Sequence, residues 1–161
     1  MSTLLVPFET TLHVRDTCLC LHAQRAARRV ARRFDEALRR FELTSGQFSL
    51  LMSLNRPVPA RMGAAADLLA MDRTTLTAAL KPLERRALVQ VMPDPADRRS
   101  RLLSLTPAGL ELLVKAVPVW HRVQAELEAG LPAGGADSLR RGLAALGQDC
   151  GAGPPGDTKR L

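Results

Sequence analysis

The stretch Asp72–Leu88, DRTTLTAALKPLERRAL, decides the fold that we expect for the rest of the chain. Asp72 is a favourable N-cap, because its carboxylate can accept hydrogen bonds from the free N–H groups of a first helical turn. One side of this helix is apolar at helical spacing, which predicts burial of Leu76, Leu80, Leu83 and Ala87. The opposite side carries Arg73, Thr74, Thr77, Lys81 and Arg85. Such a helix is suited to a DNA major groove, and a solvated amphipathic helix is the alternative.

Two shorter helices are predicted just before this stretch. Residues Thr44–Gln47 have the pattern of a capping box and open a helix that the prolines of residues 55–59 end. Residues 62–69 then predict another short helix, and residues 70–71 the turn into Asp72. Two short helices joined by a tight turn, the second with a polar N-terminal face, make a helix-turn-helix.

A β-hairpin is predicted directly after Leu88, where the apolar period changes from helical to two. Residues 89–92 and 103–105 are its strands, and residues 93–101 form a loop rich in Pro, Asp and Arg. A hairpin in this place is a wing, and an arginine at its tip can enter a minor groove. We expect Asp97 to steer Arg99 by a charge-assisted hydrogen bond. A charged surface hairpin is the alternative.

The composition limits the fold and the partners. The chain has 161 residues, only 3% aromatic residues and no Tyr, so we expect one domain with a helical core of Leu, Ala and Val. A net charge of +7 favours nucleic acid, an acidic surface or anionic lipid as the partner. No apolar run is long enough to span a bilayer. The three cysteines, an odd number, do not form a disulfide framework, so we expect a cytoplasmic protein.

Long helices are predicted on both sides of the central motifs. After a loose lead over residues 1–12, an arginine-rich helical pattern runs from Val14 to Phe41. Its modest Ala-rich apolar side favours packing on a partner chain. Its arginines either bind phosphate or form a solvated surface with internal ion pairs. Thr106 and Pro107 open another long helix, and a last short helix ends near Leu146.

This layout resembles the multiple-antibiotic-resistance repressor (MarR) family of winged helix-turn-helix regulators over residues 15–147. The resemblance rests on DRTTLT at 72–77, LERRALV at 83–89, DPADRR at 94–99 and LTPAG at 105–109. Two positions depart from the family pattern. Ala87 stands where members usually have Gly, and Pro82 lies inside the recognition helix, where it removes a hydrogen bond.

The resemblance implies a mainly α fold with a small β-hairpin wing, in a homodimer built on N- and C-terminal helices. Two recognition helices would then enter successive major grooves of a pseudo-palindromic duplex, with the wings in the flanking minor grooves. The implied protein is a transcriptional regulator, a repressor that a small molecule or an oxidant releases. We expect a single domain over 1–147, with dimerisation helices at 14–43 and 107–147, a DNA-binding lobe at 44–106 and a disordered tail at 148–161.

The residue roles follow from this arrangement. We assign Arg73, Thr74, Thr75 and Thr77 to base edges or nearby phosphates, with Arg73 as the candidate for a bidentate guanine contact. We assign Lys81 to phosphate, Arg99 to the minor groove, and Arg98 and Arg101 to the DNA backbone, with Asp97 beside them.

The signal is left open between an oxidant and a small aromatic molecule. Cys20 falls eight residues before Arg28, where the organic-hydroperoxide-resistance branch of the family keeps its reactive cysteine, and Cys18 lies nearby. This predicts a peroxide-sensing thiol, although Gln24 and Phe34 stand where that branch has tyrosines. The cysteines are otherwise small apolar fillers. Many family members instead bind a small aromatic acid or phenol between the dimer interface and the DNA-binding lobe.

Other functions have weaker support in the sequence. Cys18, Cys20 and His22 lack a second ligand pair at zinc-site spacing, so we expect no metal and no cofactor. No nucleophile–base pair, phosphate loop or pair of carboxylates indicates an enzyme. A protein-interaction module that uses the helical arms without DNA is the remaining alternative.

Overall fold

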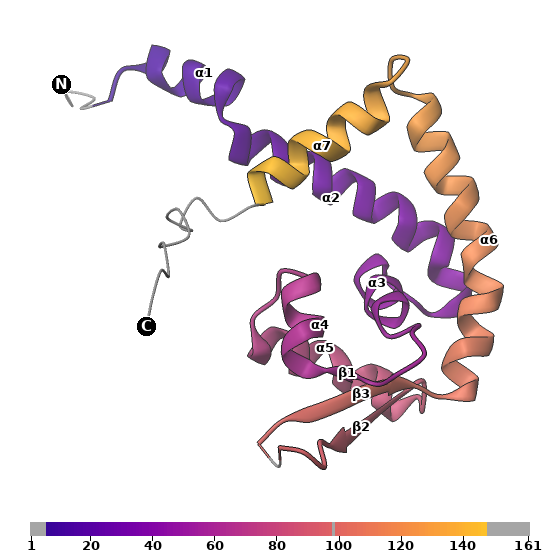
Figure 1. Cartoon of the computed structure of the whole chain (residues 1–161). Helices are drawn as coiled ribbons and strands as arrows, with labels where there is room; N and C mark the ends of the chain where they lie inside the picture. Colours follow the sequence, from indigo (N-terminus) through magenta and orange to yellow (C-terminus); the bar gives the residue numbers. More distant parts are fainter. Residues whose placement is uncertain (1–5, 98, 148–161) are drawn as a thin grey trace, which may run out of the picture. The chain divides into compact units, whose positions relative to one another are not determined.

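The computed structural model describes residues 6–97 and 99–147. They form a mainly helical fold with a small antiparallel sheet of three strands, which confirms the predicted class (Figure 1). The chain divides into two compact units, one ending at Val123 and the other starting at Gln124. No helix in the described part of the chain is long and apolar enough to cross a bilayer.

The elements follow one another in the order that the sequence indicates. Three elements are additional: the separate N-terminal helix, a 3-10 turn after the long N-terminal helix, and a two-residue strand before the helix-turn-helix. The first unit contains α1 (Phe8–Thr17), α2 (Leu19–Leu38), the 3-10 turn η1 (Arg39–Phe41), α3 (Ser45–Ser53), β1 (Ala60–Arg61), α4 (Met62–Leu68), α5 (Arg73–Arg85), β2 (Val89–Pro93) and β3 (Arg101–Leu105). Helix α6 (Pro107–Ala129) begins in the first unit and ends in the second, which also contains α7 (Gly135–Gly147).

The N-terminal prediction of one helix from Val14 to Phe41 is wrong in two respects. Helix α1 already begins at Phe8, so residues 8–12 are not a loose lead, and Cys18 separates α1 from α2. Cys18 has extended backbone angles, and its Sγ accepts a hydrogen bond from the N–H of Leu21 at 3.5 Å. A thiol that caps the next helix therefore stabilises a break that the apolar pattern does not show. The predicted tail at 148–161 lies outside the described residues.

The two helices of the predicted helix-turn-helix, α4 and α5, are confirmed. Helix α3 before them is confirmed as well, with the capping box between Thr44 and Gln47. In α5, Leu76, Leu80 and Leu83 are at most 1% exposed. Burial of a leucine contributes roughly 1.5–3 kcal/mol, so this side holds α5 in place.

The end of α5 differs from the prediction. The helix ends at Arg85, and Ala87 is exposed rather than buried, with a left-handed φ of 52°. The chain reverses there because the N–H of Leu88 donates to the carbonyl of Leu83 at 2.9 Å, a helix-ending bond that usually follows a glycine. Leu88 takes the buried position instead.

The predicted hairpin is confirmed, and a third strand joins it. Strands β2 and β3 pair antiparallel with Val91 opposite Leu103, and β1 pairs with the other edge of β3, giving the order β1-β3-β2. Strand β1 has two residues, which are too few to show a period of two in the sequence. Its partner in β3 lies about forty residues later, so only the fold brings the two together.

The start of α6 packs against the end of α5 through backbone groups. The Thr106 hydroxyl donates to the carbonyl of Ala87 at 2.6 Å and accepts from the N–H of Gly109 at 3.0 Å. The Thr106 N–H donates to the carbonyl of Leu88 at 3.1 Å. A Cβ at Gly109 would lie only 2.1 Å from the Leu88 oxygen, so this junction requires a glycine.

We expect the substitution Gly109→Ala to destabilise the protein by about 3 kcal/mol, because the added methyl group meets backbone rather than a movable side chain. Urea unfolding followed by circular dichroism measures the change. Gly46→Ala is the matched control, since its Cβ would have only the Thr44 Oγ1 near it, at 4.0 Å. That variant should be as stable as the wild type or up to about 1 kcal/mol more stable. Equal stability of the two variants would contradict the close packing.

Candidate nucleic-acid interface

The N-terminal end of α5 is held by one carboxylate. The N–H of Thr75 donates to Asp72 Oδ1 at 2.8 Å, and the Thr75 hydroxyl donates to Oδ2 at 2.7 Å. These two bonds lower the pKa of Asp72, so the cap is charged at neutral pH. The predicted N-cap is thereby confirmed, and it fixes the first turn that carries the candidate DNA-contacting side chains.

The exposed face of α5 brings together free cationic and hydroxyl groups. Arg73, Thr74 and Lys81 are exposed, and their side chains have no hydrogen-bond or ion-pair partner among the described residues. The hydroxyls of Thr75 and Thr77 already donate, to Asp72 and to the carbonyl of Arg73 respectively. Those two hydroxyls keep only their capacity to accept, whereas Arg73, Thr74 and Lys81 can donate to phosphate or to a base edge.

The wing is organised by a buried carboxylate that the sequence reading missed. Asp94 is 4% exposed, and its Oδ1 accepts from the N–H of Ala96 at 2.9 Å. Its Oδ2 lies 3.2 Å from Nε of Arg61 in β1, an ion pair without an aligned hydrogen bond among the described residues. The backbone N–H of Asp94 also donates to the carbonyl of Ser100 at 3.1 Å, closing the loop. Because Arg61 is remote in sequence, no local pattern indicates this pair.

Asp97 holds the wing in a different way from the one predicted. Its carboxylate accepts from the backbone N–H of Arg99 at 3.0 Å, so it fixes the turn, and no bond to the Arg99 guanidinium is present. Arg99 and Arg101 are exposed and have no partner in the described ranges, so both side chains are free to reach a ligand. Arg98 lies outside the described residues.

The C-terminal end of α5 is anchored by Arg86, which the sequence reading also missed. Its guanidinium donates to the carbonyls of Glu42 at 2.5 Å and Phe41 at 3.0 Å. The two acceptors follow α2 by way of η1, so Arg86 joins the far end of α5 to the end of the long N-terminal helix. Forty-four residues separate Arg86 from Glu42 in sequence, so a local pattern could not predict the contact.

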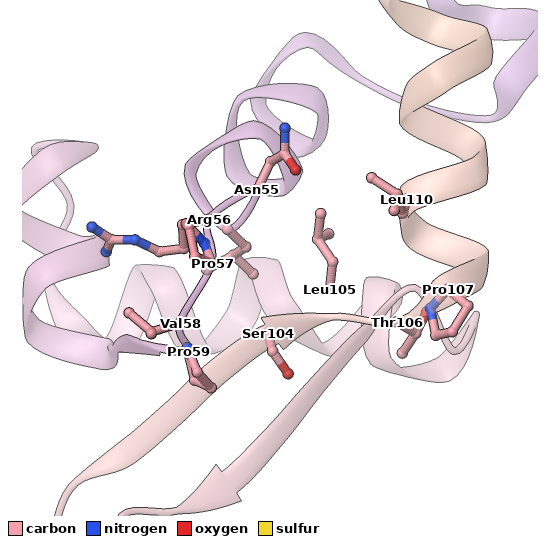
Figure 2. A pocket seen from close by; sticks show the side chains of 11 residues that line it. Asn55, Arg56, Pro57, Val58, Pro59, Ser104, Leu105, Thr106, Pro107 and Leu110 are labelled. Atoms are coloured by element: carbon pink, nitrogen blue, oxygen red, sulfur yellow. The ribbon is translucent and has the colours of Figure 1, made fainter.

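Two hollows of the first unit are lined by residues from more than one element. One, of about 470 Å³, is lined by residues 54–59, by the end of β3 and by the start of α6. Arg56 is the one cation in its lining, and Figure 2 shows the Arg56 guanidinium pointing away from Leu105 and Leu110.

The other hollow, of about 370 Å³, lies between α3 and α6 and is rich in aromatic side chains. Trp120, the only tryptophan of the chain, stacks with Phe34 and with Phe48 at centroid distances of 6.5 and 6.3 Å. The ring of His121 meets Trp120 edge-on. The lining residues are Phe48, Ser49, Met52, Val117, Trp120 and His121.

Cys18 and Cys20 lie at the start of α2, and neither bonds a residue that we assign to DNA. Cys18 caps α2, and Cys20 is exposed in the first turn of α2, where Gln24 Nε2 donates to its Sγ at 3.2 Å. No group of three or more potential metal ligands occurs in residues 6–97 and 99–147. Oxidation sensing by Cys20 stays a prediction.

Comparison with known proteins identifies the chain's relatives. The sequence model of the MarR family matches residues 43–100. The HTH-type transcriptional repressor NicR of Pseudomonas putida is 35% identical over 89 residues, which are 55% of this chain and 56% of NicR. The chain thus spans about half the length of the curated relatives that it matches first.

Solved structures match over more of the chain. The M. tuberculosis transcriptional regulator MosR in complex with DNA has a TM-score of 0.74 and 40% identity, over 81% of this chain and 94% of that one. Bordetella bronchiseptica BpsR, whose DNA binding is regulated by 6-hydroxynicotinic acid, has a TM-score of 0.74 and 26% identity, over 82% of this chain and 94% of BpsR.

We expect the cap at Asp72 to make stability depend on pH. Because the pKa of this carboxyl is lowered on folding, its contribution is complete above the unfolded pKa of about 4 and is lost as the pH falls through the lower, folded value. Asp72→Ala should therefore lower Tm at pH 7, and in acid the gap to the wild type should narrow to the gap that a neutral cap leaves. Asp72→Asn retains a neutral cap, so its stability difference from Asp72→Ala should stay nearly constant with pH. A gap between Asp72→Ala and the wild type that is as wide in strong acid as at pH 7 would contradict the assignment.

Proposed function

The chain belongs to the MarR family, and on that premise we propose that it is a homodimeric, sequence-specific DNA-binding regulator of transcription. It acts in the cytoplasm as a repressor and has no catalytic activity of its own. A small aromatic acid or phenol binds the hollow between α3 and α6 and releases the DNA.

The observation that carries this proposal is the free donor surface of α5. Arg73, Thr74 and Lys81 are exposed without partners in the described ranges, on a helix whose two ends are held by Asp72 and Arg86. A rigid helix with free donors loses little side-chain order on binding and can read base edges in a major groove. Arg99, free in the wing, supplies the minor-groove contact. MosR, 40% identical, has been solved with DNA.

The exposed apolar side chains of the outer helices support a homodimer. Helices α1 and α7 contain no buried residue, and Phe8, Leu139 and Leu146 are each more than half exposed. Leu19 of α2 is 65% exposed. Large apolar surfaces of this kind mark protein–protein interfaces, and a second copy doubles the number of bases read. Because a two-fold dimer reads both half-sites alike, the target is pseudo-palindromic.

The aromatic hollow is the better effector site of the two. Trp120 and Phe48 supply flat apolar surface for an aromatic ring, and His121 at its edge can hydrogen-bond a carboxylate or phenol. The lining of this hollow comes from α3 and α6. In the other hollow the one cation points away, which leaves no charged partner for an acid. An effector between α3 and α6 can change how α6 sits against the DNA-binding helices.

We expect the double substitution Arg73→Ala, Arg99→Ala to weaken binding to the operator at least about 100-fold, because each arginine contributes about 1–3 kcal/mol. The operator is first selected from random duplexes with the wild type. Electrophoretic mobility shift measures binding, and light scattering measures the dimer, which should be intact.

The matched control removes two exposed cations elsewhere, in Lys115→Ala, Arg141→Ala. It should bind the operator within a few-fold of the wild type. Affinity of the wild type should also fall steeply with salt, because several phosphates are neutralised. Equal loss of operator binding in both double variants would contradict the proposal, and so would an affinity that does not depend on salt. Either result would favour a protein-interaction module.

We expect small aromatic acids such as hydroxynicotinic and hydroxycinnamic acids to quench the fluorescence of Trp120 and to release the operator over the same concentration range. Both effects follow from one binding event, because Trp120 is the only tryptophan and lines the hollow. His121→Ala should weaken both effects together while leaving operator affinity without effector unchanged.

Quenching without release would show a binding site that does not regulate DNA binding. Release by an organic hydroperoxide, abolished by Cys20→Ser and unchanged by His121→Ala, would instead establish the oxidant-sensing alternative. The two outcomes are separable because Cys20 is not among the residues that line the hollow.

A further inference from the structure

An arginine-rich side of α2 is not used by the function proposed above. Seven arginines lie on α2 and η1 over residues 25–40, and this segment has only two acidic residues. We call this surface the arginine stripe; its members are Arg25, Arg28, Arg29, Arg32, Arg33, Arg39 and Arg40. All seven are exposed.

Most of the negative charge nearby is already engaged. Glu36 pairs with Arg39, and the Asp35 carboxylate accepts a hydrogen bond from the N–H of Ser45 at 2.6 Å. Arg25, Arg29 and Arg32 have no hydrogen-bond or ion-pair partner in the described part of the chain. The alternative that the sequence left open, a surface with internal ion pairs, therefore does not describe Arg25, Arg29 and Arg32.

The stripe faces away from the core of the first unit. Arg25 and Phe34 are nine residues apart, as are Arg29 and Leu38, and nine residues are two and a half helical turns. Since Phe34 and Leu38 are buried, the two arginines point in the opposite direction. Figure 1 shows α2 on one side of α3, with α5 and the sheet on the other. The stripe is thus a surface separate from the one that carries Arg73.

The chemistry of the stripe selects its partner. Protein interfaces are centred on buried apolar or aromatic side chains, which the stripe lacks. Single-stranded nucleic acid is held by aromatic stacking, and the Phe41 ring at the end of the stripe is already covered by the Arg40 guanidinium, 4.7 Å from its centroid. Guanidinium groups without apolar anchors are suited to phosphate oxygens, which they bind in a bidentate manner. Arg25, Arg29 and Arg32 repeat along about 10 Å of one helix side, so they can contact successive backbone phosphates.

We infer that the arginine stripe of α2 is a second, sequence-independent binding surface for the phosphate backbone of duplex DNA. It can hold a duplex segment other than the operator, because it lies away from α5 and the wing. The inference goes beyond the proposed regulator and does not need α5 to bind DNA.

The test uses a labelled 25-base-pair duplex of arbitrary sequence and a background with Arg73→Ala, Arg99→Ala. Adding Arg29→Gln, Arg32→Gln should weaken binding about tenfold at 50 mM salt and flatten the plot of log affinity against log salt by about two units. Adding Lys115→Gln, Arg141→Gln is the charge-matched control and should change both quantities little. Arg29→Lys, Arg32→Lys should keep the salt dependence, and circular dichroism should show equal helicity throughout.

Equal effects of the two glutamine pairs would overturn the inference, since net charge alone would then explain the binding. Competition by polyglutamate as effective as by unlabelled duplex would also overturn it, in favour of an acidic protein partner. The proposed function fails independently of this result: it fails if Arg73→Ala, Arg99→Ala leaves operator affinity unchanged, a measurement in which the stripe is intact.

Discussion

The backbone of Gly109 lies against the carbonyl of Leu88, and the rest of the DNA-binding lobe depends on that contact. Thr106 bonds the carbonyls of both Ala87 and Leu88, so the end of α5, the start of β2 and the first turn of α6 share one set of hydrogen bonds. A side chain at position 109 would separate them. Because these bonds join backbone groups to one another and to the Thr106 hydroxyl, none of the three elements can move there without leaving a polar group unpaired.

Helix α5 is consequently held at both ends by different means. Asp72 caps its start with a charge, and Arg86 ties its end to the carbonyls of Phe41 and Glu42, just beyond α2. The wing is held in the same manner, since Arg61 of β1 neutralises the buried Asp94. Among the described side chains that we assign to DNA, only Thr75, Thr77 and Asp97 carry structural bonds of this kind. Support and recognition are therefore mostly divided between different residues.

Helix α6 connects the Thr106 junction with the aromatic hollow around Trp120. Both features lie in the first unit, on one continuous helix. A ligand that repositions this part of α6 acts on an element that is bonded to the end of α5, which gives the proposed release of DNA a physical route. The connection through Arg86 gives α2 a comparable link to α5.

The sequence by itself determined the elements whose signals are local. Asp72, the capping box at Thr44 and the change of period after Leu88 each specify a helix start or a strand within a few residues, because hydrogen bonds and alternation over that range depend on neighbours alone. The sequence patterns of the helix and the hairpin also predicted that Arg73, Lys81 and Arg99 are exposed.

Only the tertiary structure decided the contacts between residues distant in sequence. The pairing of β1 with β3, the ion pair of Arg61 with Asp94 and the anchor at Arg86 join segments tens of residues apart, and no local period records them. The break at Cys18 and the left-handed Ala87 also escaped the pattern. There a single side-chain or backbone hydrogen bond outweighs the helical preference of the residues around it.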